Sequence, residues 1–187
     1  MKYLALDIGN VCIKIDPVRC YGKLGFQEVP REVVPLVMAL ECGKISEDEF
    51  WQGFVDLFPQ HRKSRAELEA AFDSILIGPV PGMEELISSL PARGIQPVFF
   101  SDVSARHMKL VRKIFKAADA VPEGIYSFET GSWKPGEAMF SAFEQRFGKP
   151  VLYVDDRKEL IASAAERNWN ALVFTGAEDL EKALQKL

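Results

Sequence analysis

Cysteine is scarce in this chain, long apolar runs are absent, and positive charge is not in excess. The three cysteines (Cys12, Cys20 and Cys42) are odd in number and lack metal-ligand spacing, which predicts reduced thiols in a cytoplasm. No apolar stretch approaches the roughly 20 residues that span a bilayer. No signal-peptide pattern follows Met1, so we expect no membrane association. A formal net charge of -4 argues against general nucleic-acid binding.

The composition is that of an ordinary globular protein, with 48% hydrophobic residues and a mean hydropathy of -0.03. At 187 residues the chain is long enough for one domain, or for one domain with an insertion. It contains no internal repeat and no low-complexity segment.

Several short apolar runs end at polar residues that can do chemistry. The runs are 2–6 before Asp7, 97–100 before Ser101 and Asp102, and 151–154 before Asp155 and Asp156. Continuous apolar runs of this length suit strands buried on both faces of a parallel sheet. In such sheets ligands bind beyond the carboxyl ends of the strands. Carboxylates, a hydroxyl and Lys134 gathered there can hold a divalent metal and a phosphate, which favours an enzyme.

The order of the predicted elements indicates an α/β fold with an insertion. From residue 81 onward, predicted helices and strands alternate, which implies right-handed crossovers and a parallel sheet. Residues 16–78 predict helices only, and Ser46 and Ser64 each begin a Ser-x-x-Glu capping box. We therefore expect a core domain of residues 1–15 and 79–187, and a helical cap of residues 16–78 over the carboxyl edge of the sheet.

Four motifs occur in a fixed order along the chain. They are Asp7-Ile8-Gly9-Asn10-Val11, Ser101 after an apolar strand, Lys134-Pro135 at the start of a helix, and Asp155-Asp156. In this order and spacing the chain resembles the haloacid dehalogenase (HAD) superfamily, whose members are mostly phosphohydrolases. The resemblance covers essentially the whole length and implies a Rossmann-like core with a cap. The segment from Gly43 to Trp51 is similar to caps of the glucose-1-phosphatase-like branch.

The resemblance implies a role for each motif residue. Asp7 would be the nucleophile that forms an aspartyl-phosphate, and Ser101, Asp102, Lys134 and Asn10 would bind the phosphate group. Lys134 and Ser101 would thereby take part in catalysis. Mg²⁺ would be held by Asp7, the Gly9 carbonyl and Asp156, with Asp155 either a direct ligand or one shell further out. The substrate would be a small phosphorylated molecule.

Each motif residue also has a plainer interpretation. Asp7 with Gly9 and Asn10 can form a polar turn after a strand, and Ser101 can cap a helix. Lys134 can be a surface lysine before a helix-opening proline, and the acidic pair can cap the helix that begins at Arg157. The joint occurrence of these residues at strand ends favours the functional interpretation.

Three residues depart from the pattern of the family. Gly9 stands where its phosphatases usually have a second aspartate that donates and accepts protons, as in the Asp-x-Gly-Asn form of the glucose-1-phosphatase-like branch. Asp102 places a carboxylate beside the phosphate site, and one hypothesis is that it supplies the missing proton transfer. Trp133 replaces a common basic residue. We expect Trp51 to be a packing residue, or alternatively to face the pocket from the cap. We expect His107 to have a structural role or to lie at the rim of the pocket.

Two functions follow from these observations. The first is a Mg²⁺-dependent phosphatase of a small phosphorylated metabolite, a sugar phosphate being one candidate. The second is a catalytically impaired protein of the same fold that binds a phosphate ligand or a protein partner. A dehalogenase is disfavoured by the acidic pair Asp155-Asp156, which it does not need. A receiver-like signalling domain is disfavoured by the helical insertion and by the position of Asp7 after the first strand.

Overall fold

The computed structural model describes residues 2–60 and 62–187; Met1 and His61, the predicted start of the core and a predicted cap residue, lie outside them. Its centre is a five-stranded parallel sheet in the order β5-β4-β1-β6-β7. The strands are β1 (Lys2–Leu6), β4 (Ile95–Ser101), β5 (Glu123–Tyr126), β6 (Leu152–Asp155) and β7 (Ala171–Val173). The predicted α/β class and parallel sheet are confirmed.

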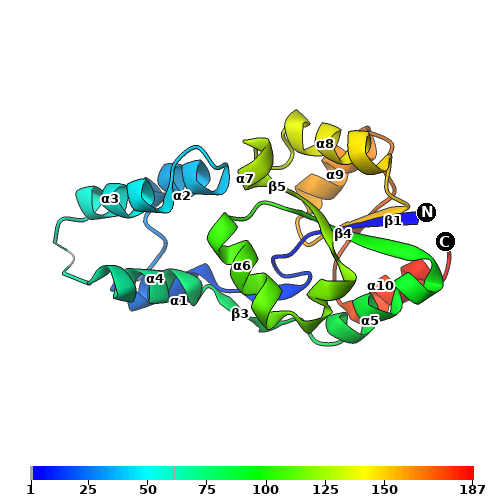
Figure 1. Cartoon of the computed structure of the whole chain (residues 1–187), viewed down its shortest axis with the longest axis horizontal. Helices are drawn as coiled ribbons and strands as arrows, with labels where there is room; N and C mark the ends of the chain where they lie inside the picture. Colours follow the sequence, from blue (N-terminus) through cyan, green and yellow to red (C-terminus); the bar gives the residue numbers. More distant parts are fainter. Residues whose placement is uncertain (1, 61) are drawn as a thin grey trace.

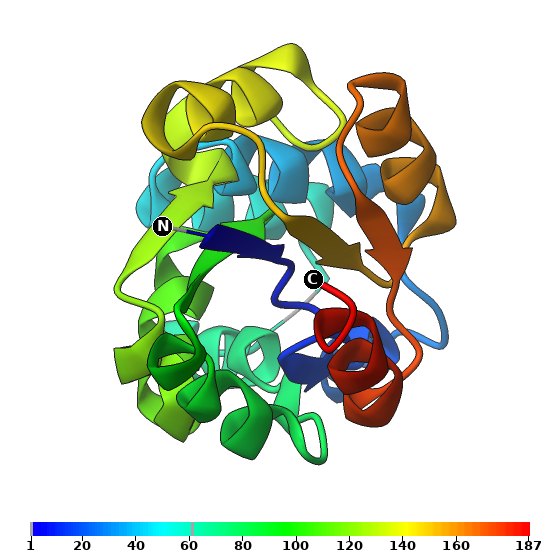
Figure 2. The ribbon, with the colours of Figure 1, turned by 90° about the vertical axis from the view of Figure 1, so that its right-hand side faces the viewer.

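Helices cover both faces of this sheet (Figure 2). One face carries α5 (Met83–Ser89), α6 (Ala105–Ile114) and α10 (Ala177–Leu184), and the other carries α8 (Glu137–Phe147) and α9 (Lys158–Glu166). Because side chains alternate along a strand, Leu4 and Leu6 pack on the first face while Ala5 packs on the second. The remaining short helices of the core are η2 (Pro91–Arg93), η3 (Lys116–Ala120) and α7 (Ser127–Thr130).

The cap helices form a second lobe beside the carboxyl edge of the sheet (Figure 1). They are α1 (Pro17–Lys23), η1 (Arg31–Val33), α2 (Val34–Glu41), α3 (Glu47–Leu57) and α4 (Arg65–Asp73). Ser46 and Ser64 cap α3 and α4, and both capping boxes are complete, as predicted. The lobe has its own core of buried aromatic side chains, in which Trp51 packs. Trp51 is therefore a packing residue and does not line the main cavity.

The segment 16–78 is not purely helical, which corrects the prediction. Helix α4 ends at Asp73, and β3 (Leu76–Pro79) pairs antiparallel with β2 (Ile13–Ile15). The spacing of Ile75 and Leu76 resembles a further helical turn, but the backbone of β2 offers hydrogen bonds that a helix there would forgo. The two strands form the double connection between core and cap. Helix α1, capped by Asp16, lies within the segment predicted to be helical, although no individual helix was predicted there.

None of the helices in the described part of the chain is long and apolar enough to cross a membrane.

Candidate functional site

The floor of the site is a buried ion cluster around Lys134. Its Nζ donates to Asp7 Oδ1 at 2.9 Å, to Asp155 Oδ2 at 2.7 Å and to the Phe100 carbonyl at 2.9 Å. Asp7 follows β1, Phe100 lies in β4 and Asp155 ends β6, so three neighbouring strands position the cluster. The Lys134 side chain is 0% exposed, which makes it an internal counter-ion rather than a surface lysine.

Burial and charge shift the pKa values of these three groups in different directions. Burial raises the pKa of Asp7 to about 6, although Lys134 opposes the shift. Burial also penalises the charged forms of Lys134 and Asp155. At Lys134 the attraction of the Asp7 and then the Asp155 carboxylate outweighs this penalty, and at Asp155 the attraction of Lys134 does so. The pKa of Lys134 is therefore raised and that of Asp155 lowered. Lys134 and Asp155 form a stable ion pair beside a carboxylate that ionises near neutral pH.

Three carboxylates, two of them belonging to this floor, lie close together. Oxygen atoms of Asp7, Asp155 and Asp156 lie within 4.8 Å of one another. Asp155 Oδ2 accepts from Lys134 and from the Tyr153 hydroxyl, and its Oδ1 accepts from the Arg157 amide, so most of its capacity is taken. Carboxylate oxygens are the ligands that Mg²⁺ prefers, so this donor set fits the ion.

Asn10 braces the outermost of these carboxylates. Its Nδ2 donates to Asp156 Oδ2 at 3.1 Å, and its Oδ1 accepts from the Ile15 amide at 3.2 Å. The backbone of Asn10 is left-handed with φ 52°, a conformation that asparagine adopts more readily than most residues. Asn10 thus joins the turn after β1 to the acidic pair after β6.

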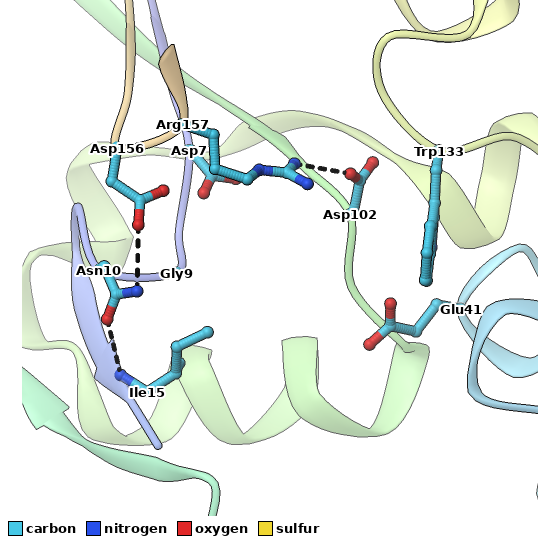
Figure 3. A pocket seen from close by; sticks show the side chains of 9 residues that line it. All are labelled: Asp7, Gly9, Asn10, Ile15, Glu41, Asp102, Trp133, Asp156 and Arg157. Carbon is cyan, nitrogen blue, oxygen red and sulfur yellow. Dashed lines mark hydrogen bonds and ion pairs between the residues drawn. The ribbon is translucent and has the colours of Figure 1, made fainter. Parts of the chain in front are cut away.

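A cavity of about 250 Å³ opens over the cluster at the carboxyl edge of the sheet. Figure 3 shows the side chains that surround it. Its lining residues are Asp7, Gly9, Asn10, Ile15, Glu41, Asp102, Trp133, Asp156 and Arg157. The cavity brings together most of the residues predicted from the sequence, while Lys134 and Asp155 lie beneath it.

Ser101 is displaced from the main cavity. It is 2% exposed at the end of β4 and lines a smaller cavity of about 70 Å³ that shares Gly9, Ile15, Glu41 and Asp102 with the main one. Its hydroxyl is one of the groups that lower the pKa of Asp7, so it lies beside the carboxylate.

Asp102 is held by two partners rather than left to repel an anion. Its Oδ1 accepts from the Lys134 amide at 2.8 Å, and its Oδ2 accepts from Arg157 Nη2 at 2.9 Å. The guanidinium forms an ion pair with the Asp102 carboxylate and restores the positive charge that Trp133 does not supply. This arrangement argues against Asp102 as a proton donor.

Sequence reasoning missed Arg157 and Glu41 as site residues. The sequence predicts Arg157 as the start of a helix, and its position directly after the acidic pair is the signal that could have marked it as a site residue. Glu41 ends α2 and enters the cavity from the cap, and no local pattern marks it. Burial, and next the Asp102 carboxylate, raise the pKa of Glu41 to about 7. The buried indole N–H of Trp133 makes no hydrogen bond of ordinary geometry among the described residues, but it lies close enough to the Glu41 carboxyl to oppose the rise of its pKa.

A second cavity of about 190 Å³ adjoins the first where the cap meets the core and shares Glu41 and Trp133 with it. Most of its other lining side chains are apolar, among them Val29, Val34, Val37, Phe72 and Ile75. An apolar compartment thus continues the polar one.

The first turn of α6 in the core contacts the cap. Arg106 forms ion pairs with Asp73 at 2.6 Å and Glu47 at 3.1 Å, and His107 stacks on Phe72 with Nε2 3.2 Å from its carbonyl. Burial lowers the pKa of His107 to about 4, so the imidazole is neutral at pH 7. His107 thus joins α6 to the cap, and it also lines the two smaller cavities, so both the structural and the pocket-rim interpretation describe its position.

Known structures share this architecture, although no family model and no curated protein matches the sequence. The HAD family enzyme BT-2542 from Bacteroides thetaiotaomicron is 23% identical with a TM-score of 0.85, and the match covers 98% of each chain. A predicted HAD-like family hydrolase from Porphyromonas gingivalis is 18% identical with a TM-score of 0.83, over 100% of this chain and 97% of its own. BT-2542 has also been solved in complex with magnesium and inorganic phosphate.

A more distant neighbour is the L-2-haloacid dehalogenase from Xanthobacter autotrophicus, with 11% identity, a TM-score of 0.64, and coverage of 100% of this chain and 83% of its own. These likenesses show that the chain has the fold of the HAD family hydrolases.

Proposed function

We propose that this chain is a Mg²⁺-dependent phosphatase that transfers the phosphoryl group of a small ester to Asp7. The observation that carries the proposal is the position of Asp7 in the floor of the cavity, hydrogen-bonded to the buried Lys134 and flanked by two further carboxylates. A carboxylate held in this way can attack phosphorus in line and form an aspartyl-phosphate, which water then hydrolyses. Lys134 balances the charge of Asp7 as the reaction proceeds.

We propose Asp7, Asp156 and the Gly9 carbonyl as the Mg²⁺ ligands, with Asp155 orienting Lys134 behind them. The hydrogen bonds already made by Asp155 support this division of roles. When bound, Mg²⁺ would offset the repulsion between the Asp7 carboxylate and an anionic phosphate group. The magnesium and phosphate complex of BT-2542 is in keeping with this proposal.

We further propose that the phosphate group sits near Asn10, Ser101 and Arg157, with Asp102 holding Arg157 in place. The organic part of the substrate would then extend past Trp133 into the apolar cavity of the cap. A sugar phosphate, the candidate from the sequence, needs hydrogen-bond partners around its hydroxyls, which this lining offers sparingly. The lining favours an ester with an apolar organic part. The buried, free thiols of the three cysteines fit a cytoplasmic location.

The test is phosphate release from p-nitrophenyl phosphate, sugar phosphates and nucleotides, with Mg²⁺ and with EDTA. We expect Mg²⁺-dependent release that falls roughly 10⁴-fold or more in Asp7→Asn, because the amide is a poor nucleophile. Asp56→Asn, on the exposed face of α3, is the matched control and should retain wild-type activity.

Activity of Asp7→Asn within about tenfold of wild type would contradict the aspartyl-phosphate route. If the folded wild-type protein releases no phosphate from any ester, the second candidate is favoured: a protein that binds phosphate or a partner with little turnover. Gly9, which leaves no acid beside Asp7, is the observation in favour of that candidate.

A further inference from the structure

The proposed reaction needs a proton donor, and the turn after Asp7 does not supply one. Gly9 has no side chain, and a Cβ built there would lie 3.2 Å from Ile15 Cδ1 and 3.8 Å from Asp7 Oδ2. Ile15 therefore occupies the space beside the nucleophile that a longer side chain at position 9 would use. An alkoxide is a poor leaving group without a proton, and general acid catalysis typically contributes about 10²–10⁴-fold.

Elimination among the titratable residues that line the main cavity leaves one candidate donor. Asp7 is the proposed nucleophile, and Asp156 is the proposed metal ligand braced by Asn10. Both oxygens of Asp102 accept hydrogen bonds from cationic or amide groups, and the Arg157 guanidinium does not give up its proton. The remaining titratable lining residue is Glu41.

Glu41 lies on the side of the cavity where a leaving group would depart. In an in-line displacement the nucleophile and the leaving oxygen occupy opposite sides of phosphorus. Asp7 approaches from the sheet, so the leaving oxygen faces the cap, from which α2 delivers Glu41. Figure 3 shows the Glu41 carboxylate turned into the cavity on the Trp133 side, away from Asn10 and Asp156.

The backbone of Glu41 is fixed to the core although the residue belongs to the cap. The buried Ser127 hydroxyl donates to the Glu41 carbonyl at 2.6 Å and accepts from the Val103 amide at 2.9 Å. Val103 follows Asp102 directly, so one hydroxyl joins Glu41 to the loop of the phosphate site. Gly43, at φ +61°, lets the chain pass the Phe128 carbonyl at a distance that a Cβ would not allow.

We propose that Glu41 is the general acid of this enzyme and donates its carboxyl proton to the ester oxygen that leaves phosphorus. As the bond from Asp7 to phosphorus forms and the ester bond breaks, the proton passes from Glu41 to the leaving oxygen, which departs as an alcohol. In the second half-reaction the Glu41 carboxylate takes a proton from the attacking water. Inorganic phosphate departs, Asp7 is freed, and Glu41 is again protonated. This role rests on the proposed phosphatase function.

The surroundings of Glu41 suit a group that must be protonated near neutral pH. The titratable or charged groups around it are Asp102, Arg157 and Asp7 from the core loops, Cys20 and Tyr21 from α1, Cys42 beside it, and His107 from α6. The thiols and the phenol have raised pKa values and His107 a lowered one, so all four are neutral at pH 7. The charge balance at Glu41 is therefore set by two carboxylates and one guanidinium.

The test compares phosphate esters of similar shape that differ in how much their leaving group needs a proton. For wild type and Glu41→Gln we would measure kcat/KM with p-nitrophenyl phosphate, whose phenolate leaves unaided, and with benzyl phosphate, whose alkoxide does not. We expect Glu41→Gln to lose about 10²–10⁴-fold on benzyl phosphate and to change by less than about threefold on p-nitrophenyl phosphate. Glu32→Gln, an exposed change just before α2, is the control and should alter neither rate.

The pH profile provides a second readout that a structural role would not produce. With benzyl phosphate, wild-type kcat/KM should fall above a pH of about 7, because the ionised carboxylate has no proton to give. Glu41→Gln should lack this alkaline limb.

Three results would overturn the proposal. One is an equal loss on both esters in Glu41→Gln, and another is an unchanged alkaline limb. The third is failure of the wild-type protein to release phosphate from either ester, which would remove the proposed phosphatase function as well. Retained activity on p-nitrophenyl phosphate shows that the variant is folded.

Discussion

At the residue scale, the site depends on Lys134 as the internal counter-ion of two buried carboxylates. Removing one partner of a buried ion pair leaves an uncompensated charge, which typically costs about 3–5 kcal/mol. We expect Lys134→Met to lower the free energy of unfolding by this amount at pH 8, as measured by urea denaturation. The loss should be smaller at pH 5, since Asp7, whose pKa is already raised to about 6, can then take up a proton.

The exposed Lys158→Met is the matched control and should change the free energy of unfolding by less than about 0.5 kcal/mol. If Lys134→Met lowered the free energy of unfolding by less than about 1 kcal/mol at pH 8, the groups around Lys134 would not be ionised in the folded protein.

Residues at strand ends could be predicted from the sequence, and residues on the cap could not. Asp7 and Asp155 each follow an apolar run, so a local pattern marks them and the parallel sheet brings them together. In the sequence, Glu41 is an ordinary polar residue at the end of a helix. Only the packing of α2 against the core places it in the cavity. The pairing of Arg157 with Asp102 joins positions 55 residues apart, and no spacing rule predicts it.

At the scale of elements, α6 is a core helix that joins the cap through ion pairs. The Arg106 guanidinium donates to both carboxylate oxygens of Asp73, at 2.6 and 2.8 Å, and reaches Glu47 on α3 as well. Hydrogen bonds between charged groups of this kind contribute about 2 kcal/mol in total when partly shielded from water. We expect Arg106→Ala to speed hydrogen exchange of the α4 amides by about tenfold or more, with little effect on β1 and β4.

Lys109→Ala on the exposed side of the same helix provides the comparison and should leave exchange in α4 unchanged. If Arg106→Ala leaves the exchange in α4 unchanged too, the ion pairs do not restrain the cap.

The two strands between core and cap show where element prediction from sequence failed. Leu76 continues the apolar spacing of α4, yet it lies in β3 because the chain pairs there with β2. The paired positions of β2 and β3 are more than 60 residues apart along the chain. Such a pairing depends on the tertiary arrangement of the two segments, so no local sequence pattern predicts it. The capping boxes of α3 and α4 were predicted correctly because they are local.

At the scale of the whole molecule, acid should weaken the junction between the lobes through His107. Its pKa is lowered from 6.5 to about 4 by burial, so the unfolded chain binds a proton there more readily than the folded chain. The stability that the neutral imidazole contributes is therefore present above a pH of about 6.5. It is lost as the pH falls toward about 4, by about 3 kcal/mol in all.

Asp7 and Glu41 act in the opposite direction, because their raised pKa values let the folded chain gain protons first as the pH falls. The contribution of His107 is thus isolated by comparing wild type with His107→Gln. We expect the difference in unfolding free energy between the two proteins to shift by about 3 kcal/mol in favour of the variant between pH 7 and pH 4. A difference that is constant with pH would show that His107 is not buried as a neutral group.

The hydrogen bond from Ser127 to the Glu41 carbonyl ties the proposed acid to the core, so the site is complete only while the two lobes are in contact. If the lobes parted, this bond would break and Glu41 would leave the cavity with α2, while Asp7 and Lys134 stayed with the sheet. Under the proposed mechanism, the open form would hold the nucleophile without the group that protonates the leaving alcohol and then activates water. Turnover of any ester, reactive or not, would then be confined to the closed form.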